Sequence, residues 1–328
     1  MDKLSPAALA RPPLESTGGR RAARGGRGLS RRGWLRAALG FGSGALGLEV
    51  LSLGGTWDHR SARVRAAPPA PPLAPGVPRL THVGHSCHLF EISGQRWLTD
   101  PWFYNPAFGS LVHESGLAVE AVGPLDGIFV SHRHPDHFDP RALAQLDKRA
   151  RVWTPDPSLL TPLRELGFGN VQLSHAWETF NVGQVEVSFT PAEHDVPEHS
   201  LVLASPEARV LFCGDTGPHH LWAEIRRRYR PTTALLPCDA TALRWEPRLI
   251  MDAEEAARAA EVLGCPQVFQ THADATYGDP VARHLLSTTS PEPVASLERA
   301  LGTLCPAPFQ PLAIGETRRL FSPDSITL

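Results

Sequence analysis

Nine residues, "SHRHPDHFD" at 131–139, hold three histidines and two aspartates and follow the apolar run "LDGIFV". The apolar run predicts a buried strand, so these side chains gather where that strand ends. Residues two apart in an extended segment point the same way, which lets His132 and His134 converge on one metal ion. A turn at the proline then lets Asp136 and His137 reach a neighbouring ion. A histidine-rich surface loop is the competing interpretation of this stretch taken alone.

Three further strand-like runs each end in a potential ligand. His194 follows the alternating run "VEVSFT", Asp215 follows "RVLFC", and His272 follows "QVFQT". Loops at one edge of a sheet would bring these side chains to the histidine-rich stretch. An isolated histidine is more often structural than a ligand, but seven candidates that follow apolar runs favour a metal centre. Imidazole and carboxylate are the ligands expected for zinc, iron or manganese.

The chain from residue 79 onwards predicts alternating strands and helices. Strand-like runs include "RLTHV", "CHLFEIS", "RWLTD", "SLVLAS" and "TALLP", with a hairpin turn at 93–95. Helices are predicted over residues 140–147, 157–167, 218–229, 252–264 and 294–303. Asp252 and Glu255 fit a capping box for the fourth of these, and Gly264 ends it. Early hairpins followed by strand–helix alternation favour an α/β sandwich of two mixed sheets with outer helices over a doubly wound sheet.

The 328-residue chain has a formal net charge of −2, but its charges are unevenly placed. Residues 1–78 carry 12 of the 32 Lys and Arg residues and only 4 of the 34 Asp and Glu residues. Residues 79–328 are therefore acidic, which argues against nucleic acid as a partner. Five cysteines without a C-x-x-C pair indicate neither a disulfide scaffold nor a thiolate zinc site.

The N-terminal segment predicts an export signal and a tether. The stretch "SRRGWL" at 30–35 resembles the twin-arginine export signal, and the uncharged run 37–48 follows it. That run is too short to span a bilayer, which needs about 20 apolar residues. We expect a signal region over 1–66, a Pro/Ala-rich linker over 67–78 and a catalytic domain over 79–328. The protein would then pass through the twin-arginine machinery to the periplasm without a transmembrane span.

A different interpretation of the same segment is a disordered basic tail in which two arginines are adjacent by chance. The protein would then stay in the cytoplasm. The twin-arginine route carries proteins that are already folded, so it suits a domain that takes up its metal before export.

The four ligand-bearing motifs together resemble the metallo-β-lactamase-fold hydrolase superfamily across about residues 79–280. Its H-x-H-x-D-H motif, strand-end histidine, G-D-T aspartate and final histidine all have counterparts here. Within it, "VGHSCHLFEISGQRWLTDPWF" resembles the branch of ascorbate-phosphate lactonase and the phospholipase D that hydrolyses N-acyl-phosphatidylethanolamine. The motifs "TPAEH" and "GDTG" fit that phospholipase, whereas "DPWFYNPAFGS" is similar to hydroxylase-like relatives.

The resemblance implies an αββα four-layer sandwich with two divalent ions, zinc first and iron or manganese as alternatives. The implied ligands are His132, His134 and His194 for one ion, Asp136, His137 and His272 for the second, and Asp215 between them. The two ions would share a water and provide a bridging hydroxide that cleaves an ester, lactone or phosphodiester. Asp136 would orient that hydroxide and take its proton, so no nucleophilic serine or cysteine is needed.

Several other residues have both a functional and a structural interpretation. His85 is expected at the metal pocket as a catalytic or substrate contact, or else as a turn histidine. Asp100 is expected to support a metal ligand, or else to cap the turn before the following proline. His199 competes with His194 as third ligand of the first ion, with His194 favoured by its "TPAEH" context. His219 and His220 are expected to begin a helix rather than to line the pocket, so we give them no role.

The chain departs from the phospholipase branch directly after His272. The relatives have a Gly-Thr-aromatic signature there, and this chain has Ala273-Asp274-Ala275-Thr276. The wall next to His272 is therefore expected to differ, and the substrate is expected to be a small or lipid-derived molecule. Three alternatives stay open: a phospholipase-D-like enzyme acting at a membrane, a di-iron redox protein on the same fold, and a binding protein without activity.

Overall fold

The computed structural model describes residues 76–107, 111–243, 247–279, 287–304, 309 and 311–325. All of them belong to the second of two compact units into which the chain divides, Asp58–Leu328. The predicted signal region and most of the predicted linker lie outside the described residues, so both remain predictions. Within the described ranges, no helix is both long and apolar enough to cross a membrane.

The first sheet contains the early hairpins. Its strand order is β17 (Thr317–Arg319), β1 (Arg79–Gly84), β2 (Cys87–Ile92), β3 (Gln95–Thr99), β5 (Gly127–Phe129), β6 (Arg151–Thr154) and β7 (Asn170–Leu173). Pairing is antiparallel from β17 to β3 and parallel from β3 to β7. Ser93 and Gly94 join β2 to β3 with φ angles of 50° and 75°, which confirms the predicted hairpin turn.

The second sheet follows in the chain and is also mixed. Its strand order is β14 (Gln267–Thr271), β12 (Thr233–Pro237), β11 (Arg209–Phe212), β10 (His199–Ala204), β9 (Val185–Pro191) and β8 (Thr179–Val182). Pairing is antiparallel from β8 to β11 and parallel from β11 to β14. Two small sheets join β4 (Leu111–Val112) to β15 (Thr276–Tyr277) and β13 (Ala242–Leu243) to β16 (Ser287–Thr288).

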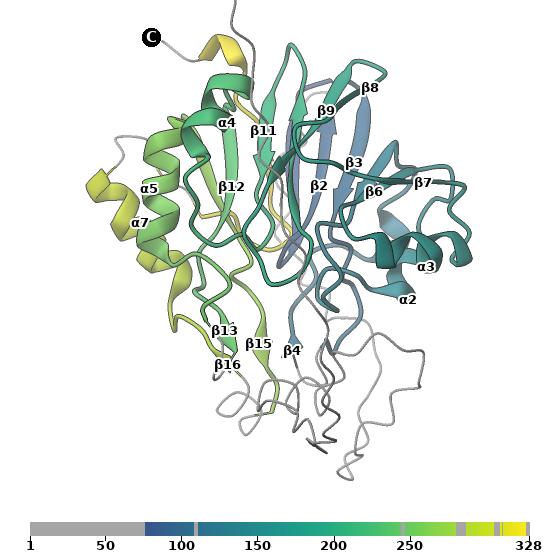
Figure 1. The fold of residues 1–328 in the computed structure, drawn as a ribbon, viewed down its shortest axis with the longest axis horizontal. Coiled ribbons are helices and arrows are strands. Elements are labelled where there is room, and N and C mark those ends of the chain that lie inside the picture. The colour runs from purple at the N-terminus through teal and green to yellow at the C-terminus, as the bar shows by residue number, and fades with distance from the viewer. Residues whose placement is uncertain are drawn as a thin grey trace, which may run out of the picture. The chain divides into compact units, whose positions relative to one another are not determined.

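The helices lie outside the two sheets, as Figure 1 shows. They are α2 (Pro140–Leu143), α3 (Leu160–Glu165), α4 (Trp222–Tyr229), α5 (Ala253–Leu263) and α7 (Pro293–Leu304), with 3-10 turns η1 (Val119–Ala121), η2 (Pro157–Leu159) and η3 (Pro323–Ser325). The predicted start of α5 is confirmed, because Asp252 and Glu255 form a capping box there. Its predicted end is also confirmed, since Gly264 follows with φ 64°.

Three helices are shorter than the sequence predicted. The helix predicted over 157–167 begins as the 3-10 turn η2 and is α-helical only in α3. After α2, Gln145 and Leu146 donate to carbonyls three residues back, so the chain tightens into 3-10 turns instead of continuing the α-helix. Before α4, the Nδ1 atom of His219 accepts the backbone N–H of Leu221, 3.2 Å away. That contact closes a turn, and the helix begins after it.

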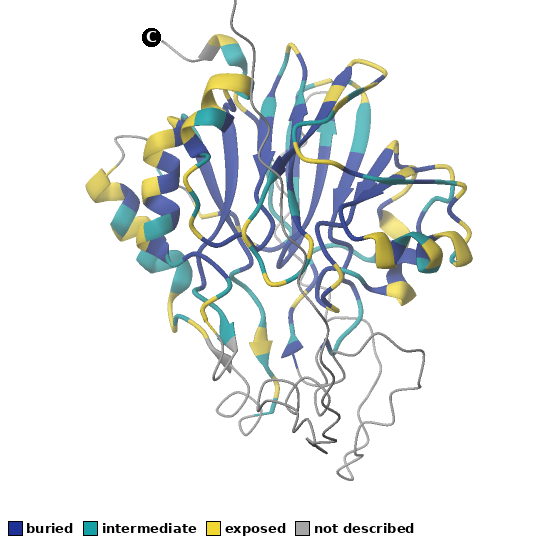
Figure 2. Ribbon diagram, in the orientation of Figure 1, coloured by how far each residue is buried: buried dark blue, intermediate teal, exposed yellow. Residues whose placement is uncertain are grey.

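Buried side chains form three layers of core. Figure 2 shows that the strands of both sheets are largely buried. The middle layer lies between the sheets, where the rings of Phe129 on β5 and Phe189 on β9 are 5.6 Å apart. Val185 and Val187 share that face with Phe189, as their alternation predicted. The outer layers join the first sheet to α2 and α3, and the second sheet to α4, α5 and α7. The predicted αββα order of layers is therefore confirmed.

Candidate metal centre

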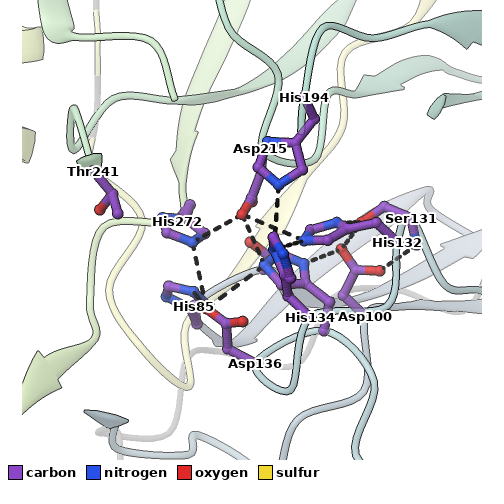
Figure 3. Close-up of polar contacts among 12 residues, drawn as sticks. His85, Asp100, Ser131, His132, His134, Asp136, His194, Asp215, Thr241 and His272 are labelled. Atoms are coloured by element: carbon purple, nitrogen blue, oxygen red, sulfur yellow. Dashed lines mark hydrogen bonds and ion pairs between the residues drawn. The ribbon is translucent and has the colours of Figure 1, made fainter. Parts of the chain in front are cut away.

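The first group of ligand atoms comes from the loops after β5 and β9. The Nε2 atom of His132 lies 3.0 Å from Nδ1 of His134, and Nε2 of His194 lies 3.3 Å from the same Nδ1. A tetrahedral metal with bonds of about 2.0 Å would separate its ligand nitrogens by about 3.3 Å. These three nitrogens therefore have the spacing of ligands to one ion, and Figure 3 shows their rings converging.

The second group lies beside the first. Asp136, His137, His272 and His85 each offer one ligand atom, all within 4.8 Å of one another. The Oδ2 atom of Asp136 lies 3.3 Å from Nε2 of His85, 3.6 Å from Nε2 of His272 and 3.8 Å from Nε2 of His137. His85 reaches this group from the turn between β1 and β2, where its φ is 55°. The structure thus places His85 among the potential ligands, whereas the sequence predicted a catalytic or substrate contact.

Asp215 lies between the two groups. Its Oδ2 atom is 3.0 Å from Nε2 of His137, 3.1 Å from Nε2 of His272 and 3.7 Å from Nε2 of His132. The preceding Gly214 has φ 63°, and a Cβ there would collide with the side chain of Glu198. The tight turn after β11 therefore requires glycine, and it aims the carboxylate at both groups of histidines.

The two central carboxylates each have an oxygen that the protein does not satisfy. Asp136 Oδ1 and Asp215 Oδ1 are buried and make no hydrogen bond to any residue that the structure describes. A buried carboxylate oxygen without a partner is unfavourable unless a cation or an ordered water satisfies it. Together with the converging imidazoles, this donor set fits two divalent cations.

A model of the beta-lactamase superfamily domain matches residues 95–273, which is more than half of the chain. This range contains every predicted ligand and the strands that carry them. The chain belongs to the beta-lactamase superfamily. The superfamily predicted from the motifs is thereby confirmed, while the particular branch is not.

One curated relative and two solved structures are similar to this chain. A metal-dependent hydrolase of Aeropyrum pernix is 30% identical over 223 residues, which cover 62% of this chain and 86% of the relative. Among solved structures, a metallo hydrolase of Ignicoccus hospitalis is 21% identical with a TM-score of 0.57 and covers 74% of this chain and 97% of that one. An isothiocyanate hydrolase from Delia radicum gut bacteria is 20% identical with a TM-score of 0.61 and covers 74% and 99%.

One further structure of the same fold belongs to a protein with a different activity. The diiron β-hydroxylase of Streptomyces venezuelae is 19% identical to this superfamily member, with a TM-score of 0.57. The match covers 75% of this chain and 55% of the hydroxylase. At these identities the solved structures establish the fold alone.

Carboxylates hold two of the histidines by their outer nitrogens. Asp100 Oδ2 lies 2.8 Å from Nδ1 of His137 and also accepts the Ser131 hydroxyl at 2.7 Å. Asp239 Oδ2 lies 3.0 Å from Nδ1 of His272. An Nδ1–H bond to a carboxylate leaves the Nε2 lone pair free for a metal. The contact predicted for Asp100 is therefore present in the structure, and its alternative role as a turn cap is not needed.

Sequence reasoning missed three acidic residues near the centre. Glu198 Oε1 accepts the backbone N–H of Asp215 at 2.6 Å and lies 3.6 Å from Nδ1 of His132. Asp195 Oδ1 lies 3.4 Å from Nε2 of His194. The third is Asp239, which follows the apolar run "TALLPC" and so carries the same strand-end signal as the predicted ligands. Glu198 and Asp195 lie in an irregular loop and carry no such signal.

The remaining histidines of the sequence prediction lie away from the two groups. His199 is on β10, where its Nδ1 atom lies 3.0 Å from the hydroxyl of Ser174. The ring of His219 stacks on Trp222 at 3.8 Å, in the turn before α4. Burial lowers the pKa of His199 and of His219 to about 4 each, so both rings are neutral near pH 7. The structure thus places His194, and not His199, beside His132 and His134.

The pKa values of the central side chains favour the binding of cations. Burial lowers the pKa of His132 well below its usual value and that of His194 to about 4, so both rings are neutral. Burial alone would raise the pKa of Asp136 and Asp215, but neighbouring histidines, His137 first, hold both pKa values well below the usual range. Burial alone would lower the pKa values of His137 and His272, but neighbouring carboxylates, Asp215 first, raise both well above the usual value. A cation at the second group would therefore displace protons from these two rings, whereas His132 and His194 are already in the neutral state that binds divalent metals.

Proposed function

We propose that this protein is a metal-dependent hydrolase that uses two divalent ions to cleave an ester, a lactone or a phosphodiester. The observation that carries the proposal is the pair of adjacent ligand groups joined by Asp215, in which Asp136 and Asp215 each have one buried carboxylate oxygen without a hydrogen bond. The 30% identity to the metal-dependent hydrolase of Aeropyrum pernix supports the same activity class.

Two bound divalent ions would supply Lewis-acid polarisation of the substrate and would lower the pKa of a shared water. Asp136 has the position to orient the attacking water through Oδ1 and to accept its proton. Burial lowers the pKa of His85, so its neutral ring donates Nε2–H toward Asp136 Oδ2 and fixes the carboxylate. Asp100 and Asp239 keep the rings of His137 and His272 in place through their outer nitrogens.

A di-iron redox protein is the competing proposal. The favouring observations are the diiron hydroxylase among structures of the same fold and the suitability of imidazole and carboxylate for iron. The hydrolytic proposal takes precedence because the match to the metal-dependent hydrolase of Aeropyrum pernix is 30% identical and covers 86% of that protein, whereas the match to the diiron hydroxylase is 19% identical and covers 55% of it.

Metal analysis by plasma mass spectrometry of protein purified without added metal or chelator separates the two proposals. Bound zinc at about two ions per chain supports hydrolysis, whereas iron at that occupancy supports redox chemistry. The hydrolytic proposal is next tested on panels of esters, lactones, phosphodiesters including phospholipids, and an isothiocyanate.

The decisive variant is Asp136→Asn, which keeps the shape of the side chain and removes its charge. Turnover is expected to fall at least about 10²-fold, the size of a lost proton-transfer group. Asp147→Asn, which alters a carboxylate paired with Arg149 away from the centre, is the matched control and is expected to leave turnover unchanged. Unchanged turnover in Asp136→Asn would refute the proposed mechanism.

A further inference from the structure

A buried ion pair lies next to the second ligand group and has no role in the mechanism above. The Nε2 atom of His82 is 3.0 Å from Oδ2 of Asp274. His82 is completely buried, and the side chain of Asp274 is only 17% exposed. Asp274 follows the ligand His272 by two positions, at the point where the sequence departs from the phospholipase branch. A charged pair in such a place needs an explanation, because the desolvation cost of a buried ion pair often exceeds the attraction between its charges.

His82 is held rigidly in its strand. Its backbone N–H donates to Glu316 at 3.0 Å, and its carbonyl accepts the N–H of Gly315 at 2.8 Å. Its Nδ1–H donates to the carbonyl of Leu312 at 3.0 Å, and its ring stacks on His88 at 4.9 Å. With Nδ1 as a donor, Nε2 is left to face Asp274. His82 therefore gives the loop after β14 a fixed point of attachment in the first sheet.

The loop that Asp274 belongs to carries a ligand in an unfavourable conformation. His272 has φ 49°, in the left-handed region that residues other than glycine rarely adopt. Its backbone N–H donates to the carbonyl of His85 over a long 3.3 Å. Ala273 and Ala275 have no polar side chain, so Asp274 is the residue of this segment that can anchor it by a polar side-chain contact.

The same loop leads into one wall of the site. β15 pairs with β4, with Thr276 opposite Val112 and Tyr277 opposite Leu111. Ala275 and Tyr277 pack against an apolar group that includes Trp102, whose ring lies 5.2 Å from that of His85. An anchor at Asp274 therefore fixes His272 on one side and this wall on the other.

We infer that the His82–Asp274 pair is a positioning device that holds the loop of His272 and so sets the metal affinity of the second ligand group. The inference rests on the proposed function, since it concerns the second of the two proposed ions. The first ligand group receives its residues from β5 and β9 and does not depend on this loop.

The test compares Asp274→Ala with Asp274→Asn in the full-length chain, by titrating metal-free protein with Zn²⁺ in competition with a chromophoric chelator. Asp274→Ala removes the anchor, and one of the two Zn²⁺ affinities is expected to fall about 10- to 100-fold while the other stays the same, as for a lost support of one set of metal ligands. Asp274→Asn keeps the size of the side chain and removes its charge, so it is expected to lose less affinity than Asp274→Ala. The control Glu91→Ala removes the ion pair of Arg79, on the same strand as His82, and is expected to change neither affinity.

A second readout does not need bound metal. In metal-free protein, amide hydrogen exchange of residues 272–277 is expected to be faster in Asp274→Ala and unchanged in Glu91→Ala, because exchange reports local opening. Equal loss of both Zn²⁺ affinities, or no change in affinity and exchange, would overturn the inference. If the unaltered protein binds no second ion, the proposed function fails, and the exchange rates alone then decide whether Asp274 anchors the loop.

Discussion

At the scale of the residue, the two ring nitrogens of each central histidine contact different partners. In His137 and His272, Nδ1 faces a carboxylate and Nε2 faces Asp215. In His134 the order is reversed, because Nδ1 is the atom that meets His132 and His194. The residue that contacts the nitrogen facing away from the centre therefore sets the orientation of each ring. Removing that residue leaves the histidine in place but no longer fixes its orientation.

Asp100→Asn is predicted to weaken metal binding about 10- to 100-fold, which is typical for supporting carboxylates. Asp100 now accepts from His137 Nδ1 and from the Ser131 hydroxyl through the same oxygen, and an amide nitrogen at that position would oppose one of these donors. Zn²⁺ competition titration measures the effect. An affinity equal to that of the unaltered protein would show that Ser131 and the strand ends are sufficient to orient His137.

Gly214→Ala is predicted to destabilise the fold by about 2–4 kcal/mol, from a left-handed backbone and a side-chain collision together. The new methyl group would meet Glu198, whose carboxyl receives the N–H of Asp215. Urea unfolding followed by circular dichroism gives the free energy of unfolding. Gly169→Ala, where the methyl group meets nothing within 4 Å, is the control and should change that free energy by less than about 1 kcal/mol.

At the scale of the element, the ends of strands position the chemistry and the helices support the sheets from outside. β5, β9, β11 and β14 each lead directly into a loop that carries a ligand. β11, β12 and β14 are parallel, so Asp215, Asp239 and His272 arrive at the same edge of the second sheet. The helix α5 covers that sheet with a face of buried alanines and a leucine and contributes no ligand. A change in α5 should therefore affect stability without changing the metal centre.

Asp252→Ala is predicted to lower the free energy of unfolding by about 1 kcal/mol, because it removes the side-chain cap at the start of α5. Metal affinity is expected to stay the same. Glu254→Ala, an exposed residue of the same helical turn, is the comparison and should cost no more than about 0.5 kcal/mol. A loss of metal affinity in Asp252→Ala would mean that the helix also positions the ligand loops.

At the scale of the whole molecule, the metal centre lies where the two sheets meet. The first sheet supplies the histidine-rich stretch and His85, and the second supplies His194, Asp215 and His272. Bound ions would then link the two halves of the sandwich. Cations that bind the folded chain and not the unfolded chain stabilise it in proportion to the logarithm of their concentration.

Removal of metal is predicted to lower the melting temperature. Adding Zn²⁺ back is predicted to restore it. At a free ion concentration of about 100 times the dissociation constant, the stabilisation is about 2.7 kcal/mol per ion. Calorimetry with and without chelator measures it. A melting temperature that is the same in both conditions would contradict the proposal that ions join the two sheets.

Export is a property of the whole chain, and the residues that test it lie outside the described ranges. Arg31→Lys together with Arg32→Lys is predicted to keep the protein in the cytoplasm, because the twin-arginine signal requires both arginines. Cell fractionation measures the location. Arg20→Lys together with Arg21→Lys changes the other adjacent arginine pair and should not alter it. Equal distribution in both double variants would favour the basic-tail interpretation.

The sequence alone determined most of the long strands, the helix α5, the α/β sandwich and the seven residues that converge on the centre, but it did not predict β6, β7 or β8. It could determine these features because apolar periodicity marks buried strands, and because strands end where their polar ligands begin. The capping box of α5 was readable for the same reason, since its contacts span only three residues.

Only the tertiary structure decided which partners meet across the two sheets. The structure places Glu198 beside Asp215, Asp274 beside His82, and His85 beside Asp136. Each of these contacts joins segments far apart in the chain, and no local pattern encodes it. The side-chain nitrogen that each histidine presents was likewise decided there, by the carboxylate on its other side. The physical reason is that strand pairing and sheet packing, rather than sequence spacing, set the distances between these groups.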